Sequence, residues 1–157
     1  MRSVVRAFLF NPEGHILMVR HRPNTSWVLP GGHIEANESL HEAMQREIQE
    51  EFSIHATFFE IDPDEILYHQ GKPLKHFPTP ITSYALSYKN QEGIDKSRIE
   101  YIFLMETDEV IKKIQDQEIY EYQWFDPEEI LSMKPNIDTW DFIIEMLEKI
   151  MDEGEEE

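Results

Sequence analysis

The apolar residues between positions 37 and 52 recur with a helical period. Leu40, Met44 and Ile48 are spaced four residues apart, which places them on one face of an amphipathic helix. Asn37 directly precedes this pattern, and asparagine is one of the residues that cap helix N-termini. We therefore predict a helix that begins at Asn37 and ends at Phe52.

Other segments alternate between strand and helix signals. Strands are predicted where β-branched and aromatic residues are bounded by Gly, Pro or Asn, at 2–10, 15–22, 27–32, 54–62, 65–71, 81–88, 98–106 and 120–125. Helical patterns occur at 126–133 and 136–151, with one helical turn expected at 108–115. Strands that alternate with a few helices in so short a chain predict an α/β sandwich with a mixed sheet.

Composition limits the number of domains. The chain has 157 residues, of which 40% are hydrophobic, enough for one core. We expect a single domain at 1–151, followed by an acidic, disordered tail at 152–157. Because there is no cysteine, disulfides and zinc-thiolate sites are excluded. The N-terminal segment does not have a signal-peptide pattern and no apolar run is long enough to span a membrane, so we expect a cytoplasmic protein.

Net charge narrows the choice of ligand. The formal charge of −18 argues against extended nucleic acid as a partner, since binding a phosphate backbone requires a broad basic face. A small phosphorylated substrate stays compatible with this charge if divalent cations neutralise the site.

Three carboxylates, Glu47, Glu50 and Glu51, fall within an arc of roughly 100° at the end of the predicted helix. A solvated helix face is the simplest explanation for such a cluster. However, Glu47 and Glu51 repel each other at i, i+4, and each anion in the last turn opposes the helix dipole at a cost of about 0.3–1 kcal/mol. This cost favours a bound Mg²⁺ ion, with Mn²⁺ as the alternative. Arg46 follows Glu42 by four residues and is expected to pair with it.

These residues also form a longer pattern. Gly32, Glu38, Arg46, Glu47, Ile48, Glu50, Glu51 and Ile54 match the Nudix box, G-x(5)-E-x(7)-R-E-U-x-E-E-x-G-U, in which U is apolar. The sequence therefore resembles the Nudix hydrolase family. It departs from the box at Ser53, where the family has glycine. That glycine serves a left-handed helix C-cap, which Ser53 would adopt at a modest cost.

The resemblance implies a Nudix fold, an α/β/α sandwich with a mixed sheet, and hydrolysis of the pyrophosphate linkage in a nucleoside diphosphate derivative or a nucleoside triphosphate. It also implies metal ligands, namely Glu47, Glu50, Glu51 and the Gly32 carbonyl, and it places Arg46 and Glu47 in the catalytic set. Glu38 is expected either as a first-turn anion of the helix or as a partner of Arg46 within the box. Relatives often have one more acid before the late tryptophan, for which the candidates are Glu118, the preferred one, and Glu121. Glu47 is the first choice for the general base, and Glu118 and Glu121 are the alternatives.

Contacts to the rest of a small nucleotide-derived substrate are expected from scarce positive charges and from the proline-rich loop at 71–80. The candidate substrate-binding residues are Arg22, Lys72, Lys75 and Phe77. The oligomeric state is open and a homodimer is compatible with the sequence. A sensor of the same fold, which binds a nucleotide without cleaving it, is the alternative function.

Overall fold

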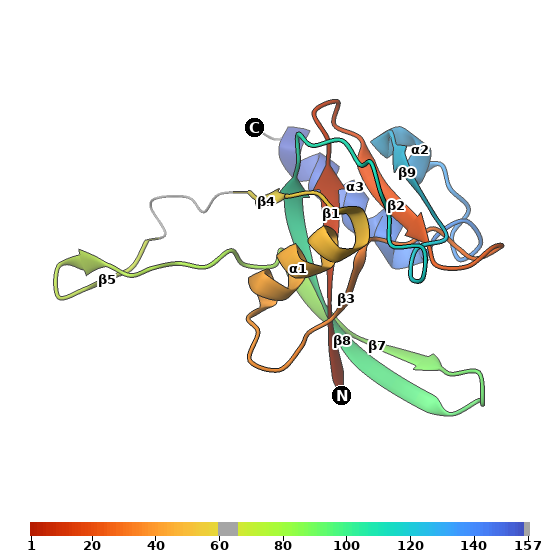
Figure 1. Ribbon diagram of the computed structural model, residues 1–157, viewed down its shortest axis with the longest axis horizontal. Coiled ribbons are helices and arrows are strands. Elements are labelled where there is room, and N and C mark those ends of the chain that lie inside the picture. The colour runs from red at the N-terminus through yellow and green to blue at the C-terminus, as the bar shows by residue number, and fades with distance from the viewer. Residues whose placement is uncertain (60–65, 156–157) are drawn as a thin grey trace.

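A mixed sheet of seven strands forms the centre of the molecule (Figure 1). The computed structural model describes residues 1–59 and 66–155. The sheet has the order β4-β8-β1-β2-β9, with β3 paired to β1 and β7 paired to β8. Its strands are β1 (Arg2–Phe10), β2 (Ile16–Arg20), β3 (Gly31–His33), β4 (Thr57–Phe58), β7 (Thr82–Lys89), β8 (Asp95–Glu106) and β9 (Glu121–Phe125). Since β1 and β8 are parallel while the other pairs are antiparallel, the predicted mixed sheet is confirmed.

Helices cover both faces of this sheet. Helix α1 (Leu40–Phe52) lies on one face, and α2 (Pro127–Leu131) and α3 (Asp141–Glu155) lie on the other (Figure 1). The alternation of side chains along β1 explains the two layers. Val5, Ala7 and Leu9 belong to the core under α1, whereas Phe8 belongs to the core under α3. The fold is therefore the predicted α/β/α sandwich.

The N-terminal cap of α1 differs from the prediction. Ser39, and not Asn37, caps the helix: its side chain accepts from the Glu42 backbone N–H, and the Glu42 side chain accepts from the Ser39 N–H. This reciprocal capping box satisfies two backbone donors, which Asn37 would not do from its place in the loop. Asn37 instead adopts a left-handed conformation, with φ of 66°. At the other end, Ser53 is a left-handed C-cap as expected, with φ of 54°.

Three other elements also differ. In the predicted strand at 27–32, only bridges form at Trp27 and Val28, and the strand β3 begins at Gly31, where we expected the strand to end. The expected helical turn at 108–115 is irregular. Helix α3 begins at Asp141 and continues to Glu155, so the tail predicted to be disordered is helical as far as Glu155, and residues 156–157 lie outside the described part. The helix continues because acidic and methionine residues are compatible with helical backbone and nothing before Gly154 interrupts it.

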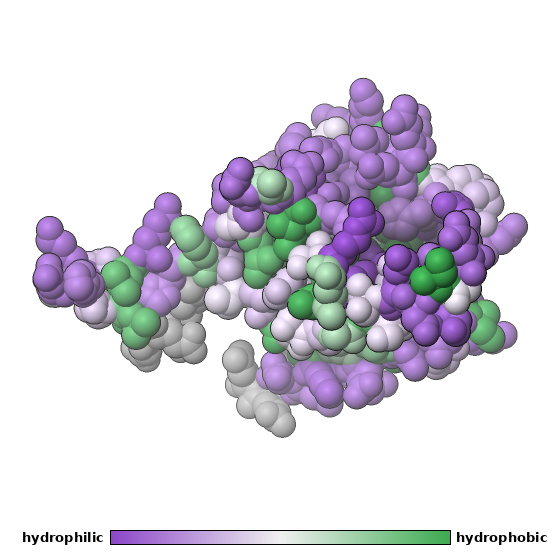
Figure 2. Space-filling view, turned by 90° about the horizontal axis from the view of Figure 1, so that it is seen from below, coloured by the Kyte–Doolittle hydropathy of each residue, from purple (hydrophilic) through white to green (hydrophobic). Residues whose placement is uncertain are grey.

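A hairpin of β5 (Tyr68–His69) and β6 (Lys72–Pro73) extends away from the body as an arm (Figure 1). Exposed hydrophobic side chains occur along it, Leu67 and Leu74 among them (Figure 2). The strands predicted at 54–62 and 65–71 are reduced to β4 and β5, and their parts within 60–65 lie outside the described residues. No helix within the described ranges is long and apolar enough to cross a membrane.

Candidate metal and catalytic site

Helix α1 and the loop before β9 bring three carboxylates together. Glu47 and Glu51 are buried on α1, and Glu118 comes from the loop, with one oxygen from each lying within 4.8 Å of the others. The loop is fixed beside the end of α1 because the Gln115 N–H donates to the Glu51 carbonyl at 2.9 Å. Three converging carboxylates are the oxygen donors that Mg²⁺ and Mn²⁺ prefer, so this cluster could hold a divalent cation.

The protonation of the two buried carboxylates supports a cation site. Burial, the charge and hydrogen bond of Glu47, and the charge of Glu118 raise the pKa of Glu51 to about 9. Burial likewise raises the pKa of Glu47. Among the described residues, Oε2 of Glu51 is buried without a hydrogen-bond partner. Such an oxygen is costly unless something pairs with it, and a divalent cation would satisfy it and allow both carboxylates to ionise.

Arg46 organises the acidic residues around this cluster. Its Nε donates to Glu38 Oε2 at 2.6 Å and its Nη2 to Glu38 Oε1 at 3.0 Å, while Nη1 donates to Glu47 at 3.0 Å and to Glu50 at 3.2 Å. The expected pair with Glu42 is wrong, because the Glu42 carboxylate caps α1 instead.

Glu50 therefore differs from the other predicted metal ligands. Its side chain is half-exposed and bound to Arg46, and the three-carboxylate cluster contains Glu118 in its place. Arg46 lies four residues before Glu50 and binds both Glu47 and Glu50. It thus relieves part of the repulsion among the glutamates at the end of the helix.

Gly32 lies against the Glu47 carboxylate. A Cβ built on Gly32 would lie 2.5 Å from Cδ and Oε1 of Glu47, so only a residue without a side chain leaves room for this carboxylate. Gly31 is constrained by backbone, since its Cβ would lie 1.9 Å from the Val5 carbonyl oxygen on β1. The two glycines therefore let β3 pair closely with β1 and approach the acidic cluster.

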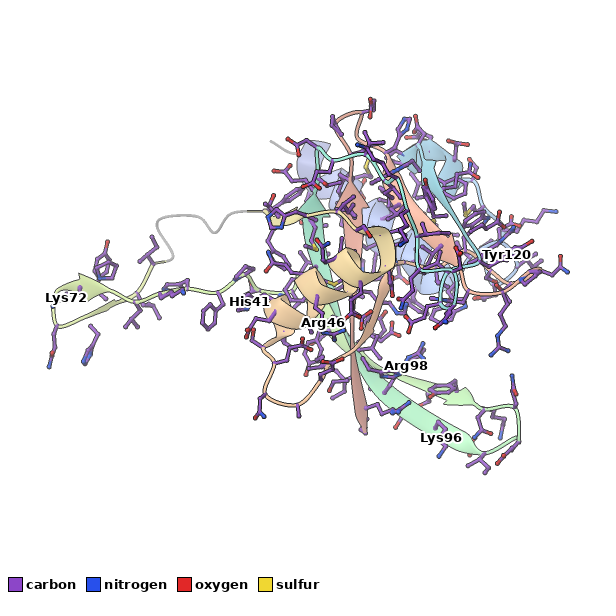
Figure 3. The ribbon with its side chains drawn as sticks, in the orientation of Figure 1. His41, Arg46, Lys72, Lys96, Arg98 and Tyr120 are labelled. Carbon is purple, nitrogen blue, oxygen red and sulfur yellow. The ribbon has the colours of Figure 1, made fainter. Side chains whose placement is uncertain are left out.

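A cavity of about 620 Å³ lies on the α3 side of the sheet. It is lined by Arg6 on β1, His21, Val28, Leu86, Tyr88, Arg98 on β8, Asn136, Trp140, Asp141 and Phe142. Figure 3 shows Arg98 on β8, with Lys96 further along the same strand toward the hairpin tip. The cavity and the acidic cluster are connected through β3, because Arg6 on β1 pairs with Gly31, and the next residue, Gly32, lies against Glu47.

The predicted substrate residues lie elsewhere. Lys72 is on the arm, remote from Arg46 (Figure 3). Phe77 stacks on His41 of α1 at 4.6 Å between ring centroids, and the Lys75 ammonium lies 5.6 Å from the Phe77 centroid. Arg22 is exposed in the segment after β2. None of these four described residues lines the cavity.

Arg6 and Arg98, which are among the scarce positive charges of the sequence, line the cavity instead. A clearer signal was available in the strands: Arg6 and Glu100 are charged residues within apolar runs, which indicates a buried ion pair or a site. Trp140 has no such signal, because a tryptophan beside a helix start is typical of ordinary core packing.

Glu121, an alternative base, forms an ion pair with Arg20 at 2.7 Å.

The family model and the similar solved structures agree on one family. The family model described as NUDIX domain matches residues 1–146. Similar solved structures include a NUDIX-family hydrolase from Clostridium perfringens (20% identity, TM-score 0.71, covering 96% of this chain and 95% of that one) and a MutT protein from Methanosarcina mazei (23%, 0.65, 98% and 94%). A C. elegans Ap4A hydrolase is also similar (17%, 0.58, 97% and 96%). A search of curated proteins returned none that matches.

Proposed function

Because the chain belongs to the NUDIX domain family, we propose that it hydrolyses, with Mg²⁺, the pyrophosphate linkage of a nucleoside triphosphate or of a nucleoside diphosphate derivative. The observation that carries this proposal is the convergence of Glu47, Glu51 and Glu118 around a buried, unpaired carboxylate oxygen. Similar solved structures include an Ap4A hydrolase and a UDP-X diphosphatase, which supports pyrophosphate chemistry in general.

Glu47, Glu51 and Glu118 would hold the cation, with Gly32 leaving room for Glu47. When bound, a divalent cation neutralises diphosphate oxygens and lowers the pKa of a bound water. Arg46 is a positioning residue, because its bonds to Glu38 and Glu47 fix the Glu47 carboxylate beside Glu51.

Hydrolysis also requires a group that accepts the proton of the attacking water. We assign this role to Glu118, since this residue is exposed while one of its carboxylate oxygens lies in the cluster. The water oxygen forms the new bond to phosphorus as the bridging P–O bond breaks, and the water proton passes to a Glu118 carboxylate oxygen. Glu47 is the less suitable base, because Arg46 already donates to its Oε1 at 3.0 Å.

The cavity between β1, β8 and the start of α3 is the place for the nucleoside. Its size is within the range of small-molecule sites, and it offers the planar side chains of Tyr88 and Trp140. Arg6 connects it to the acidic cluster through β3, where Gly31 pairs with Arg6 and Gly32 lies against Glu47. A substrate can therefore extend from the cavity, where its base is held, to the carboxylates, where its diphosphate is cleaved.

Phosphate release from a panel of nucleotides, measured with Mg²⁺, with Mn²⁺ and with EDTA, tests the proposal. We expect turnover that needs a metal. Glu118→Gln should reduce kcat by about 10²–10⁴-fold, the usual contribution of a general base, while Glu121→Gln should cause a smaller loss. Tight nucleotide binding without turnover of any compound would instead support the sensor function.

A further inference from the structure

A fully buried carboxylate lies beneath the cavity. Glu100, on β8, is 0% exposed and accepts three hydrogen bonds: from Arg6 Nε at 3.1 Å, Arg98 Nε at 2.8 Å and the Tyr84 hydroxyl at 2.6 Å. Burial alone would raise the pKa of Glu100, but Arg6, Tyr84 and Arg98 outweigh it and lower the pKa. Glu100 is therefore ionised, and its carboxylate binds two guanidinium groups.

These two arginines carry more positive charge than Glu100 neutralises. Two guanidinium groups share one carboxylate, so the cluster keeps a net charge of about +1 within a chain whose formal charge is −18. Both arginine side chains are partly buried, and an excess positive charge there is unfavourable unless a ligand or solvent compensates it. The excess faces the cavity, since both arginines line it.

The arginines also present free hydrogen-bond donors. Arg6 uses Nε for Glu100 and Nη1 for the Leu29 carbonyl, and Arg98 uses Nε alone. Within the part of the chain that the structure describes, this leaves Nη2 of Arg6 and both terminal nitrogens of Arg98 without a protein acceptor. Guanidinium groups only donate hydrogen bonds. This side of the cavity, formed by Arg6 and Arg98, can therefore bind ligand atoms that are hydrogen-bond acceptors, and we call it the donor wall.

Aromatic rings hold the Arg98 guanidinium from its faces. Its Cζ lies 5.1 Å from the Tyr88 ring centroid and 5.7 Å from that of Trp140, and Trp140 also lies 5.9 Å from Arg6 Cζ. His21, Asn136 and Asp141 also line the cavity and are exposed, and among them the Asp141 carboxylate is a hydrogen-bond acceptor. A planar ring that enters the cavity would therefore meet the guanidinium donors with one of its edges.

We propose that Glu100 is a positioning residue that holds Arg6 and Arg98 as a donor wall, and that this wall makes the cavity select a 6-oxopurine base over a 6-aminopurine base. The inference rests on the proposed function, in which the cavity holds the nucleoside. A 6-oxopurine places two neighbouring acceptors, O6 and N7, on one edge, and this edge matches the guanidinium fork. A 6-aminopurine places an N–H₂ donor at the same position, which would face another donor.

Calorimetric titration with GTP and ATP in EDTA tests this selectivity independently of hydrolysis. A bidentate guanidinium contact is expected to favour GTP over ATP by about fivefold to more than a hundredfold in Kd. 7-Deaza-GTP, which lacks the N7 acceptor, should bind more weakly than GTP. If the protein binds GTP selectively yet hydrolyses no nucleotide, the proposed function fails while the selectivity stands.

Variants identify the residues responsible. Arg98→Ala should bring the GTP to ATP ratio of Kd values toward one. Glu100→Gln should weaken GTP binding and leave ATP binding nearly unchanged, whereas a purely structural defect would weaken both. Lys96→Ala removes a positive charge two residues away on the same strand, outside the cavity, and should keep the ratio of the unmodified protein.

Equal affinity for GTP and ATP in the unmodified protein would overturn the proposal. So would a preference for GTP that persists in Arg98→Ala. If Glu100→Gln does not fold, as judged by circular dichroism, Arg98→Lys replaces it in the test: this variant keeps the charge but loses the fork, and it should lose the GTP preference.

Discussion

The Arg46 guanidinium binds both carboxylate oxygens of Glu38, at 2.6 Å and 3.0 Å, across eight residues of sequence. This bidentate contact connects the loop before α1 with the helix face that carries the acidic cluster. It leaves Nη1 of Arg46 to bind Glu47 and Glu50. The position of the Glu47 carboxylate thus depends on a residue that is not itself part of the three-carboxylate cluster.

Arg46→Lys should reduce metal affinity and kcat/KM by about 10- to 100-fold, the usual effect of a group that orients a metal ligand. Lysine keeps the charge but has no planar fork with which to bind Glu38 and Glu47 together. Isothermal titration with Mn²⁺ and steady-state kinetics measure the two quantities. As a control, Lys149→Ala breaks the exposed pair with Glu145 on α3, also at i, i+4, and should change neither.

Glu51→Gln should abolish stabilisation by the metal, since it removes the most buried carboxylate of the cluster. Glu50→Gln should keep most of that stabilisation, because Glu50 is bound to Arg46 outside the cluster. Thermal unfolding with and without Mg²⁺ compares the two variants. An equal loss of stabilisation in both variants would show that Glu50 binds the metal as Glu51 does.

The metal-free protein should lose stability as the pH rises from about 4.5 to about 9. Glu51 has its pKa raised from 4.5 to about 9 in the folded state, so between these values the folded state retains a proton that the unfolded state releases. Glu51→Gln should weaken this dependence and leave the smaller part that the raised pKa of Glu47 contributes. Urea unfolding in EDTA at several pH values measures it, and a stability that is flat with pH in the unmodified protein would contradict the raised pKa.

Two adjacent glycines should respond differently to alanine. Gly31→Ala should lower the free energy of unfolding by about 1–3 kcal/mol, because its Cβ would meet the Val5 backbone, which β1 holds in place. Gly32→Ala should instead displace the Glu47 carboxylate, a side chain that can move, and weaken Mn²⁺ binding with a smaller loss of stability. Urea unfolding and metal titration of both variants separate the two effects.

Ser53→Gly should raise the free energy of unfolding by up to about 1 kcal/mol, since glycine adopts the left-handed C-cap of α1 without strain. Ser132→Gly is the matched control. Ser132 caps α2 with φ of −92°, a conformation that serine adopts without strain. Glycine there only increases the conformational entropy of the unfolded chain, so this variant should be less stable than the unmodified protein. A destabilised Ser53→Gly would show that the left-handed conformation has little cost here.

Local patterns predicted those parts of the fold and site that depend on neighbouring residues. The stripe of Leu40, Met44 and Ile48 predicted α1, and the spacing of Glu47 and Glu51 placed both carboxylates on one of its faces. Such predictions succeed because helix geometry fixes the direction of each side chain relative to residues three or four positions away. The same locality explains the wrong cap: Asn37 and Ser39 are both suitable caps, and only the hydrogen bonds to Glu42 distinguish them.

The sequence by itself thus determined the helix, its buried face, the acidic chemistry and the resemblance to a family. Tertiary structure alone decided that Glu118 joins Glu47 and Glu51 while Glu50 pairs with Arg46, and that Arg6 meets Glu100 across 94 positions of sequence. The physical reason is that a buried charge is tolerated only where partners compensate it, and those partners come from strands and loops that are brought together by the packing of the whole sheet.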